Sequence, residues 1–333
     1  MTLQFLVSTQ TNPYLNLAVE NYLVGHSAPE TATLYLWRNR RTVVIGQNQN
    51  PYAEVNLERL LADGGYLVRR RTGGGAVYHD DGNLNFSLVI PQADYNLDRQ
   101  FAIICQAVEL FGLRSMRSGR NDIMVDCTSL NQAPSSMQSH AADWRKFSGN
   151  AFHRGTTHHL HHGTLLISGN LADLKLYLQP KPSKLLKHGV QSVSSRVANL
   201  ADLNPAISTE SIAAPLCKAF AATYGQAPQP IAFADLAENP TVQKLASQLS
   251  SDEWLYRPWR NFTAQRSGSF SWGEVDLSFT IADGHIADVQ IATDALDLDT
   301  LEQARLRLCG ASTGCPPEAT NPIESDLIAL IYQ

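Results

Sequence analysis

The sequence has little of what marks secreted, zinc-binding or membrane proteins. Its 333 residues include only five cysteines, an odd number, and no two of them form a Cys-x-x-Cys pair. This pattern argues against a disulfide framework and a zinc ribbon, and it favours a reducing compartment. No uninterrupted apolar run approaches the roughly 20 residues of a membrane helix, and the first residues lack a basic, apolar leader. We therefore expect a cytoplasmic protein without a membrane partner.

Charge of one sign is not in large excess either. The chain has 26 Lys and Arg against 31 Asp and Glu, which gives a formal net charge of -5 at pH 7. Because sequence-independent nucleic-acid binders are normally basic, we expect no nucleic-acid partner. Arginines are nevertheless concentrated at Arg38–Arg41 and at Arg69–Arg71. Such clusters are typical of a solvated surface or of an anion site, and composition leaves both open.

Apolar periodicity predicts strands and helices that alternate along most of the chain, whose length suits one large and one small domain. The expected strands are Leu3–Ser8, Thr33–Trp37, Thr42–Ile45, Tyr66–Arg70, Leu84–Ile90, Ile123–Val125 and Thr164–Ile167. The expected helices are Leu15–Val24, Leu57–Asp63, Asp98–Phe111, Leu171–Tyr177 and Ile207–Tyr224. After an Ala-, Pro- and Asn-rich stretch that ends near Pro240, the segments Ser269–Ile281 and His285–Thr293 alternate around Asp283-Gly284 and predict a hairpin. A helix over Leu301–Cys309 is expected to follow.

The most informative segment runs from Arg69 to Asp80 and contains three consecutive glycines, Gly73–Gly75. Glycine removes every Cβ atom, so the backbone can approach a ligand closely, and consecutive N–H groups form an anion-binding concavity. The preceding arginines can bind phosphate or carboxylate in bidentate fashion. Gly-Gly-Gly alone is more typical of a flexible turn, but the flanking strands and arginines favour a ligand-binding loop. It is not a P-loop, because no Gly-Lys-Ser/Thr follows.

Three further motifs carry candidate chemistry. Asn121-Asp122 enters a strand and suits either a magnesium ligand or a strand-entry turn, with neither favoured by spacing. Lys146 is followed by small residues that leave space around its ammonium, although an isolated lysine in a turn is more often simply exposed. The run His158–His162 holds four histidines, but no Cys, Asp or Glu completes a zinc set nearby. A single histidine or threonine that faces a pocket is therefore favoured there.

In this order along the chain, the motifs resemble those of lipoate–protein ligases from end to end. Further matching segments are Leu36–Asn39, Thr42–Gly46, Gln49–Pro51, Val190–Val197 and Trp272-Gly273. The Arg-Gly-Arg type of loop that biotin ligases carry is absent. The resemblance implies a mixed α/β catalytic domain with a β-sheet core, like class II aminoacyl-tRNA synthetases and biotin ligases, at residues 1–245. It implies a small α+β accessory domain at residues 246–333.

The resemblance also implies an activity and a set of site residues. The expected enzyme uses ATP and Mg²⁺ to convert lipoate to lipoyl-AMP, and then transfers the lipoyl group to a lysine. The implied acceptors are lipoyl domains of 2-oxoacid dehydrogenase complexes and the glycine cleavage H protein, and we expect a monomer. Lys146 and Asp122 are implied as catalytic, with Asp122 also as a magnesium ligand. Nucleotide and lipoyl-AMP binding is implied for Arg70, Thr72, Gly73, Gly74, Gly75, Ala76, Val77, Tyr78, His79, Asn121, Asp122, Lys146 and Ala151. The lipoate pocket is implied to contain Trp37, His162 and Thr164.

One alternative is an octanoyl or lipoyl transferase of the same superfamily, which works without ATP through an acyl-cysteine. Such relatives place a cysteine shortly before the Asn-Asp motif, whereas residues 106–121 contain none here. Cys127 is the only credible nucleophile, since Arg120 and Lys146 could lower its pKa. The chain also departs from the family at Cys127–Trp144, a Ser-, Gln- and Ala-rich connection of unusual length that we expect to form an extended loop over the site.

Overall fold

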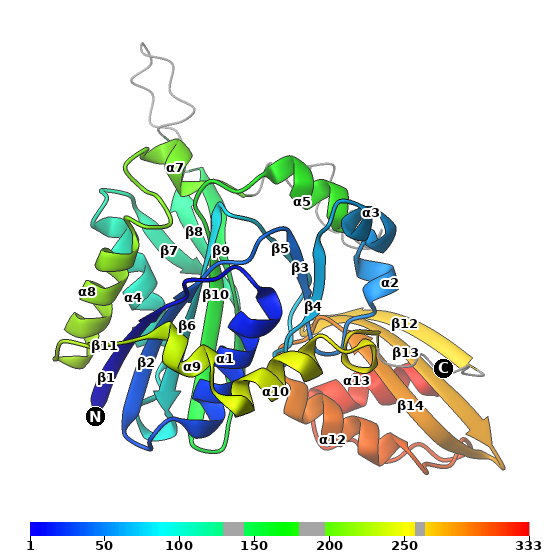
Figure 1. Cartoon of the computed structure of the whole chain (residues 1–333). Coiled ribbons are helices and arrows are strands. Elements are labelled where there is room, and N and C mark those ends of the chain that lie inside the picture. Colours follow the sequence, from blue (N-terminus) through cyan, green and yellow to red (C-terminus); the bar gives the residue numbers. More distant parts are fainter. Residues whose placement is uncertain (129–142, 180–196, 257–263, 333) are drawn as a thin grey trace.

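The computed structural model describes residues 1–128, 143–179, 197–256 and 264–332. A large mixed sheet and a smaller sheet lie against each other in the first part of the chain, and a third sheet with two helices forms the last part (Figure 1). This arrangement confirms the expected mixed α/β fold with a small C-terminal domain. Most of Cys127–Trp144 and of Val190–Val197 lies outside the described residues.

The large sheet has the strand order β11-β1-β2-β6-β10-β9-β8-β7. Its strands are β1 (Thr2–Val7), β2 (Thr31–Trp37), β6 (Asn83–Pro91), β7 (Ser115–Ser118), β8 (Asp122–Asp126), β9 (Trp144–Arg154), β10 (His158–Leu166) and β11 (Gln229–Ile231). The pairs that involve β1 are parallel and the other pairs are antiparallel. Its helices are α1 (Pro13–His26), α4 (Leu97–Glu109), α5 (Leu171–Tyr177), α7 (Leu200–Leu203), α8 (Ala213–Tyr224), α9 (Phe233–Ala237) and α10 (Pro240–Leu249), with a 3₁₀ turn at Gln92–Asp94.

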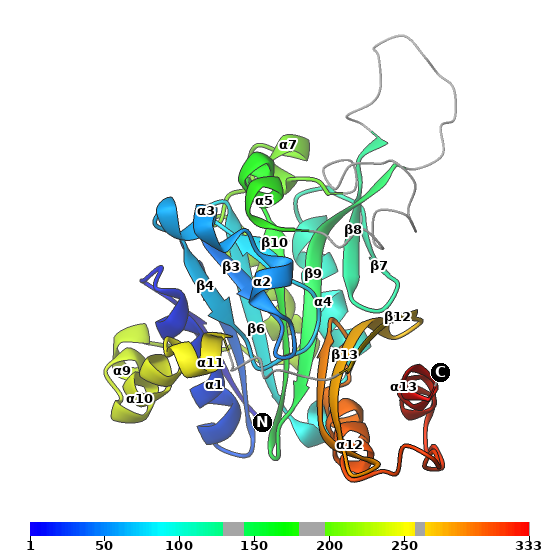
Figure 2. The same ribbon diagram turned by 90° about the vertical axis from the view of Figure 1, so that its right-hand side faces the viewer.

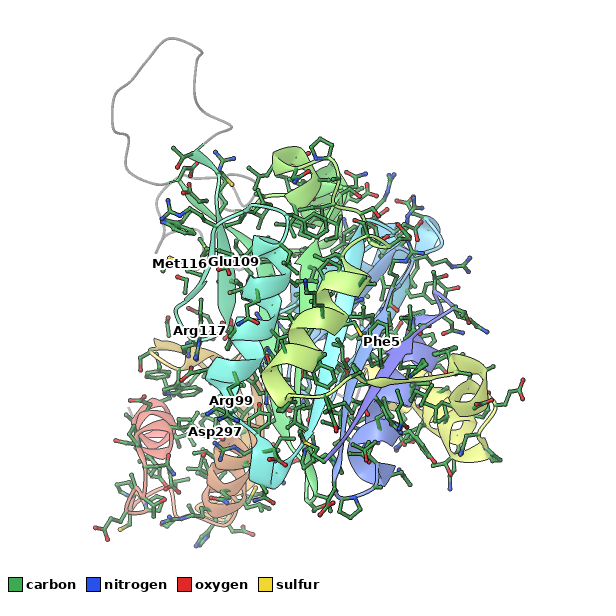
Figure 3. The ribbon with its side chains drawn as sticks, turned by 90° about the vertical axis from the view of Figure 1, so that its left-hand side faces the viewer. Phe5, Arg99, Glu109, Met116, Arg117 and Asp297 are labelled. Atoms are coloured by element: carbon green, nitrogen blue, oxygen red, sulfur yellow. The ribbon has the colours of Figure 1, made fainter. Side chains whose placement is uncertain are left out.

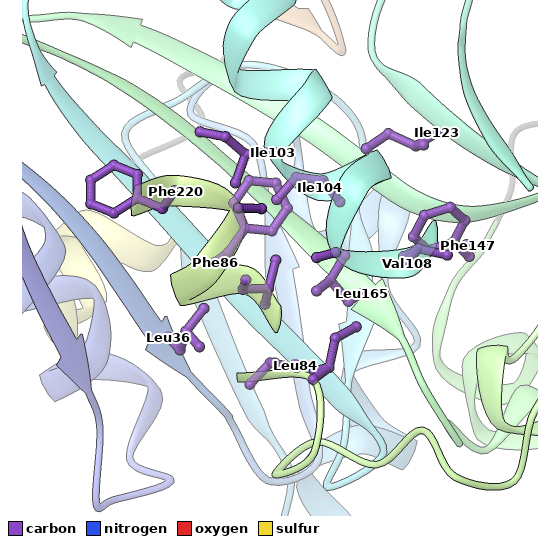
Figure 4. Packing of buried hydrophobic residues seen from close by; sticks show 14 of the residues in the cluster. Leu36, Leu84, Phe86, Ile103, Ile104, Val108, Ile123, Phe147, Leu165 and Phe220 are labelled. Carbon is purple, nitrogen blue, oxygen red and sulfur yellow. The ribbon is translucent and has the colours of Figure 1, made fainter. Parts of the chain in front are cut away.

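Both faces of this sheet are covered by helices. On one face Leu36 and Phe86 pack with Ile104 of α4 and Phe220 of α8 (Figure 4). On the other face the alternate residues of β2, such as Tyr35, pack with α1, α9 and α10. Strand β2 is buried on both sides and is mostly apolar, as expected for such a strand. Strand β6 is equally buried, but it alternates Asn83, Asn85 and Ser87 with apolar residues.

A second sheet, of order β4-β3-β5, lies on the α1 side of the large sheet (Figures 1 and 2). Its strands are β3 (Thr42–Ile45), β4 (Tyr66–Arg69) and β5 (Val77–His79), with α2 (Pro51–Glu54), α3 (Leu57–Ala62) and α11 (Asp252–Tyr256) nearby. The turn at Arg38–Arg41 therefore does not close a hairpin, because β2 and β3 belong to different sheets. The glycine-rich loop connects β4 to β5 and lies between the two sheets.

The C-terminal domain is a three-stranded antiparallel sheet with two helices. Its elements are β12 (Ala264–Phe270), β13 (Gly273–Ala282), β14 (His285–Thr293), α12 (Leu298–Leu308) and α13 (Pro322–Ile331). The expected hairpin is present as β13 and β14, but Ser269 and Phe270 belong to the preceding strand. The start of helix α8 also differs from the expectation. Helix α8 begins at Ala213 rather than Ile207, because residues before it form turns that Ser208 stabilises with hydrogen bonds to Glu210 and Ser211.

Residue 245, the expected end of the first domain, falls inside α10. Helices α10 and α11 pack on the first domain, where Val242, Leu249 and Leu255 join its apolar clusters. The fully buried Arg69 guanidinium reinforces this contact by donating to the carbonyl oxygens of Trp254 and Leu255 at 2.6–3.2 Å. We propose that the division lies between Tyr256 and Ala264. No helix in the described ranges is long and apolar enough to span a bilayer.

Candidate active site

A cavity opens between the two sheets, where strands of both contribute polar side chains. It encloses about 630 Å³, a volume that includes the open space at its mouth. Its lining includes most of the residues that the motifs single out: Trp37, Arg70, Gly74, Gly75, Ala76, Val77, His79, Asn121, Lys146, Ala151, His162 and Thr164. It also includes residues that the motifs did not indicate as pocket residues: Leu17, Val44, Asn85, Gly149, Asn150 and Gly163.

The glycine-rich loop is shaped from within by Arg70. The guanidinium is buried and donates to the carbonyl oxygens of Gly73 at 2.6 Å and Gly75 at 2.9 Å, and to Thr72 Oγ1 at 2.9 Å. Burial lowers the pKa of Arg70 to about 10, and the Glu20 carboxylate opposes this shift. These loop carbonyl groups are thus directed toward Arg70, which fixes the loop conformation before any ligand arrives.

The C-terminal domain touches the same loop. The N–H of Gly74 donates to Ala295 O at 3.0 Å, and the N–H of Thr293 donates to Asn48 O at 3.1 Å. A Cβ atom on Gly73 would lie 2.1 Å from Ala295 O, so only glycine permits this approach. At Gly74 the backbone has a φ of 89°, a region that favours glycine. The loop is therefore built for close backbone contact.

Lys146 lies on β9, where it pairs with Met124 of β8, and its side chain reaches Asp122 at the start of β8. Its Nζ is 2.7 Å from Asp122 Oδ1, and both side chains are 36% exposed. Lys146 lines the cavity, whereas Asp122 lies outside the lining. A register shift between Ile123 and Met124 accompanies the pairing of β8 with β9 here. The ammonium has room because Gly149 carries no side chain, and a Cβ there would be 3.0 Å from Nζ. The backbone is held by the N–H of Ala198, which donates to Lys146 O at 3.0 Å.

Two buried polar atoms in the cavity wall have no hydrogen-bond partner among the described residues. They are Nε2 of His79 and Nδ2 of Asn85. Burial, with smaller contributions from Arg70 and His162, lowers the pKa of His79 to about 3, so its ring is neutral at pH 7. Because unpaired buried polar atoms are rare and costly, a bound ligand is expected to supply their partners.

The histidine run of residues 158–162 lies within strand β10, not in a turn. Alternation along the strand separates the side chains. His158 contacts Thr31 O and His161 contacts Asn150 Oδ1, whereas His162 faces the cavity with Thr164. Among the described residues no group of three His, Cys, Asp or Glu is placed to bind a metal. This distribution agrees with a single histidine and threonine facing the pocket.

Some indicated residues lie outside the lining. Tyr78 points to the other side of its sheet, where its hydroxyl contacts Asp173 at 3.3 Å and its ring packs on Tyr177. Thr72 lies behind the wall and contacts His162 Nε2 at 2.9 Å.

The sequence gives no signal for Glu20 and Ser87, because a polar residue inside an apolar helix or strand carries no motif. The burial of the Glu20 side chain is the feature that indicates a role, and that burial is known only from the folded structure.

Cys127 does not have the setting of a nucleophile. Its side chain is fully buried, and the thiol faces Val125 O at 3.7 Å. Burial raises the pKa of the Cys127 thiol to about 11, and the lowering effect of Arg145 is smaller. The expectation that Arg120 and Lys146 would lower this pKa is therefore wrong, because desolvation of the thiolate dominates.

Comparison with known proteins agrees with this geometry. The lipoyl protein ligase A/B catalytic domain family matches residues 12–221, and the bacterial lipoate protein ligase C-terminus family matches residues 260–313. The chain is 36% identical over 309 residues to lipoate-protein ligase A of Psychrobacter cryohalolentis, covering 91% of this chain and 86% of that relative. It is 37% identical over 310 residues to lipoate-protein ligase A of Bdellovibrio bacteriovorus, covering 92% and 88%.

A solved structure extends the similarity over both domains. The crystal structure of P. falciparum LipL1 in complex with lipoate has a TM-score of 0.83 to this chain at 28% identity, and the match covers 99% of each chain. The site geometry and the two family matches thus indicate the same class of enzyme. The chain therefore belongs to the family of ATP-dependent lipoate–protein ligases.

Proposed function

We propose that the cavity between the two sheets binds lipoate and ATP together, forms lipoyl-AMP with release of pyrophosphate, and then transfers the lipoyl group to a lysine amine. The observation that carries this proposal is the partly exposed Lys146–Asp122 pair, whose lysine lines the same cavity as the glycine-rich loop. A carboxylate is a poor acyl donor because oxide would have to leave. Adenylation replaces oxide with AMP, which leaves readily.

In the first step the carboxylate oxygen of lipoate attacks the α-phosphate of ATP, and the bond to pyrophosphate breaks. Two anions must approach each other, so fixed positive charge at the reaction centre lowers the barrier. Lys146 supplies that charge from β9, and Gly74, Gly75 and Ala76 of the loop shaped by Arg70 line the same cavity. Because these groups are already in place, little reorganisation is needed at the moment of reaction.

Asp122 and Asn121 fit the binding of a magnesium ion that accompanies ATP. Magnesium commonly takes one or two carboxylates and completes its shell with phosphate oxygens and water. One oxygen of Asp122 already pairs with Lys146, so the second oxygen is the one that would hold the ion. When bound, magnesium would neutralise part of the phosphate charge.

In the second step an acceptor amine attacks the acyl carbonyl of lipoyl-AMP, the bond to AMP breaks, and the amide forms. A lysine amine has an ordinary pKa of ~10.4, so it must lose a proton before it attacks. Asp122 is the candidate base, and Lys146 stabilises the developing oxyanion. The proposed acceptors are the lipoyl domains of 2-oxoacid dehydrogenase complexes and the glycine cleavage H protein, encountered by a cytoplasmic monomer.

The proposal is tested with lipoate, ATP and a purified lipoyl domain as acceptor. The wild-type chain should release pyrophosphate only when lipoate is present, and the acceptor should gain the mass of one lipoyl group. Omitting the acceptor should leave lipoyl-AMP on the enzyme. Pyrophosphate release that does not depend on lipoate would contradict the proposal.

Replacement of Cys127 should leave the reaction nearly intact. Cys127→Ser removes the only candidate acyl-cysteine but no group of the cavity, so ATP-dependent lipoylation should stay within a few-fold of wild type. Intact mass should show no acyl adduct on the wild-type enzyme after incubation with an acyl donor. A hydroxylamine-sensitive adduct that disappears in Cys127→Ser, without an ATP requirement, would favour a transferase instead.

Removal of the C-terminal domain should impair adenylation more than transfer. A chain that stops after Tyr256 keeps α11 and its contacts with Arg69, but loses the contacts of Ala295 and Thr293 beside the glycine-rich loop. Since that loop is the proposed nucleotide site, pyrophosphate release should fall further than transfer from supplied lipoyl-AMP. Equal losses in a fragment with a cooperative melting transition would contradict the prediction. A cut after residue 245 should instead unfold the first domain.

A further inference from the structure

A continuous chain of buried hydrogen bonds crosses the back of the cavity. It joins a wall of the pocket to the glycine-rich loop and passes through one carboxylate on α1. Glu20 is 1% exposed and lies at the centre of this chain. The members, called here the Glu20 network, are Trp37, Ser87, Glu20, His162, Thr72 and Arg70.

One arm of the Glu20 network reaches the pocket wall. The indole Nε1 of Trp37 donates to Ser87 Oγ at 2.9 Å, and the Ser87 hydroxyl donates to Glu20 Oε2 at 2.5 Å. The indole has a single polar atom and can only donate. Ser87 must therefore direct its own proton at the carboxylate, so Glu20 fixes the orientation of the Trp37 ring.

The other arm reaches the glycine-rich loop. His162 Nδ1 is 2.8 Å from the same Glu20 oxygen, and its Nε2 is 2.9 Å from Thr72 Oγ1. Arg70 Nε donates to that Thr72 oxygen at 2.9 Å. Because a carboxylate only accepts hydrogen bonds and a guanidinium only donates them, only one assignment of donors and acceptors fits all the contacts of this arm. His162 carries its proton on Nδ1, and the Thr72 hydroxyl donates to Nε2.

Glu20 also supplies charge. It is the one anionic group that counteracts the effect of burial on the Arg70 guanidinium. Both groups are almost fully buried and are linked through His162 and Thr72, so loss of the Glu20 charge removes a favourable interaction with the Arg70 guanidinium. Loss of the carboxylate would thus weaken the hold of Arg70 on the loop carbonyl groups of Gly73 and Gly75.

We propose that Glu20 is a positioning residue, which holds the Trp37 and His162 walls of the lipoate pocket and, through Thr72 and Arg70, the shape of the glycine-rich loop. This inference rests on the proposed function for its kinetic readout. Glu20 itself touches neither reacting atom. Its effect is transmitted from one buried oxygen to both sides of the cavity, so its replacement should weaken the interaction of the enzyme with both substrates.

The decisive comparison is between Glu20→Ala, Glu20→Gln, Thr72→Val and the double variant Glu20→Ala/Thr72→Val. Lipoate-dependent pyrophosphate release gives kcat/KM, and calorimetry with lipoate alone gives binding independently of turnover. Glu20→Gln keeps an acceptor oxygen and removes the charge, so we expect a loss of about 10-fold, and about 100-fold for Glu20→Ala. Lipoate binding should weaken in the same order.

The double variant separates positioning from general stability. If Glu20 acts on the loop through Thr72, Glu20→Ala/Thr72→Val should be no worse than Glu20→Ala alone, since the second change breaks a path that is already broken. The control is Glu109→Gln, at the exposed end of α4 (Figure 3), which should match wild type.

Two results would overturn the inference: losses that multiply in the double variant, or a Glu20→Gln enzyme with wild-type kcat/KM and lipoate affinity. Glu20→Gln decides the question even if Glu20→Ala does not fold. A wild-type enzyme that binds lipoate but releases no pyrophosphate would contradict the proposed function, while the binding series would still test Glu20.

Discussion

Lys146→Ala should abolish both halves of the reaction. The ammonium of Lys146 pairs with Asp122 at 2.7 Å and lines the cavity, where in the proposed mechanism the phosphate and the acyl carbonyl both develop negative charge. Loss of one such preorganised group lowers kcat by about 100- to 1000-fold in other acyl-transfer enzymes. We expect at least that loss in pyrophosphate release, and a comparable loss in transfer from supplied lipoyl-AMP.

The matched control for Lys146→Ala is Lys218→Ala on the exposed side of α8. It removes the same charge from a helix that does not line the cavity, so it should retain wild-type rates. Near-normal activity of Lys146→Ala in either half-reaction would contradict a role for this lysine in both steps. The assay must therefore measure each half separately.

Gly74→Val should cause a second large loss. Gly74 has a φ of 89°, and a Cβ there would lie 2.9 Å from the Arg70 guanidinium that shapes the loop. A β-branched side chain in this conformation costs about 1–3 kcal/mol of strain, and the loop would have to move away from the nucleotide site. We expect adenylation to fall by about 100-fold or more.

Gly112→Val provides a control with the same backbone problem in a different place. Gly112 has a φ of 76° at the exposed end of α4, where a Cβ would meet nothing within 4 Å. Both variants should therefore lose thermal stability, but only Gly74→Val should lose activity. A Gly112→Val enzyme that is equally inactive at a temperature where it is folded would show that the effect is not specific to the loop.

The chain itself indicates much of this site, but unevenly. The glycine triplet and its arginines identify the loop, because glycine is required where the backbone approaches Ala295 so closely. The Asn121-Asp122 motif and Lys146 are 24 positions apart, yet the antiparallel pairing of β8 with β9 brings them into contact. Sequence spacing alone does not assign the Asn121-Asp122 motif or Lys146 to a site. Only the resemblance to a family implies that assignment.

Other features depend on tertiary structure and could not be predicted. Glu20 lies in a helix whose other residues are mostly apolar, so only its burial beside Ser87 and His162 reveals a network. In the sequence, Arg38–Arg41 forms a turn between two strands, β2 and β3. In the structure β3 pairs with β4 and β5 and not with β2. The Asn239-Pro240 pair suggests the approach to a linker, but in the structure it begins α10, with Asn239 as the N-cap.

The most direct test of the account is the fate of ATP and of the acyl group in a single turnover. Enzyme is mixed with lipoate and ATP labelled at the α-phosphate, without an acceptor, and the products are separated before and after acceptor is added. We expect one equivalent of lipoyl-AMP on wild-type enzyme and on Cys127→Ser, none on Lys146→Ala, and release of labelled AMP as the acceptor lysine becomes lipoylated. An unlabelled, hydroxylamine-sensitive acyl-enzyme that forms without consumption of ATP would contradict it.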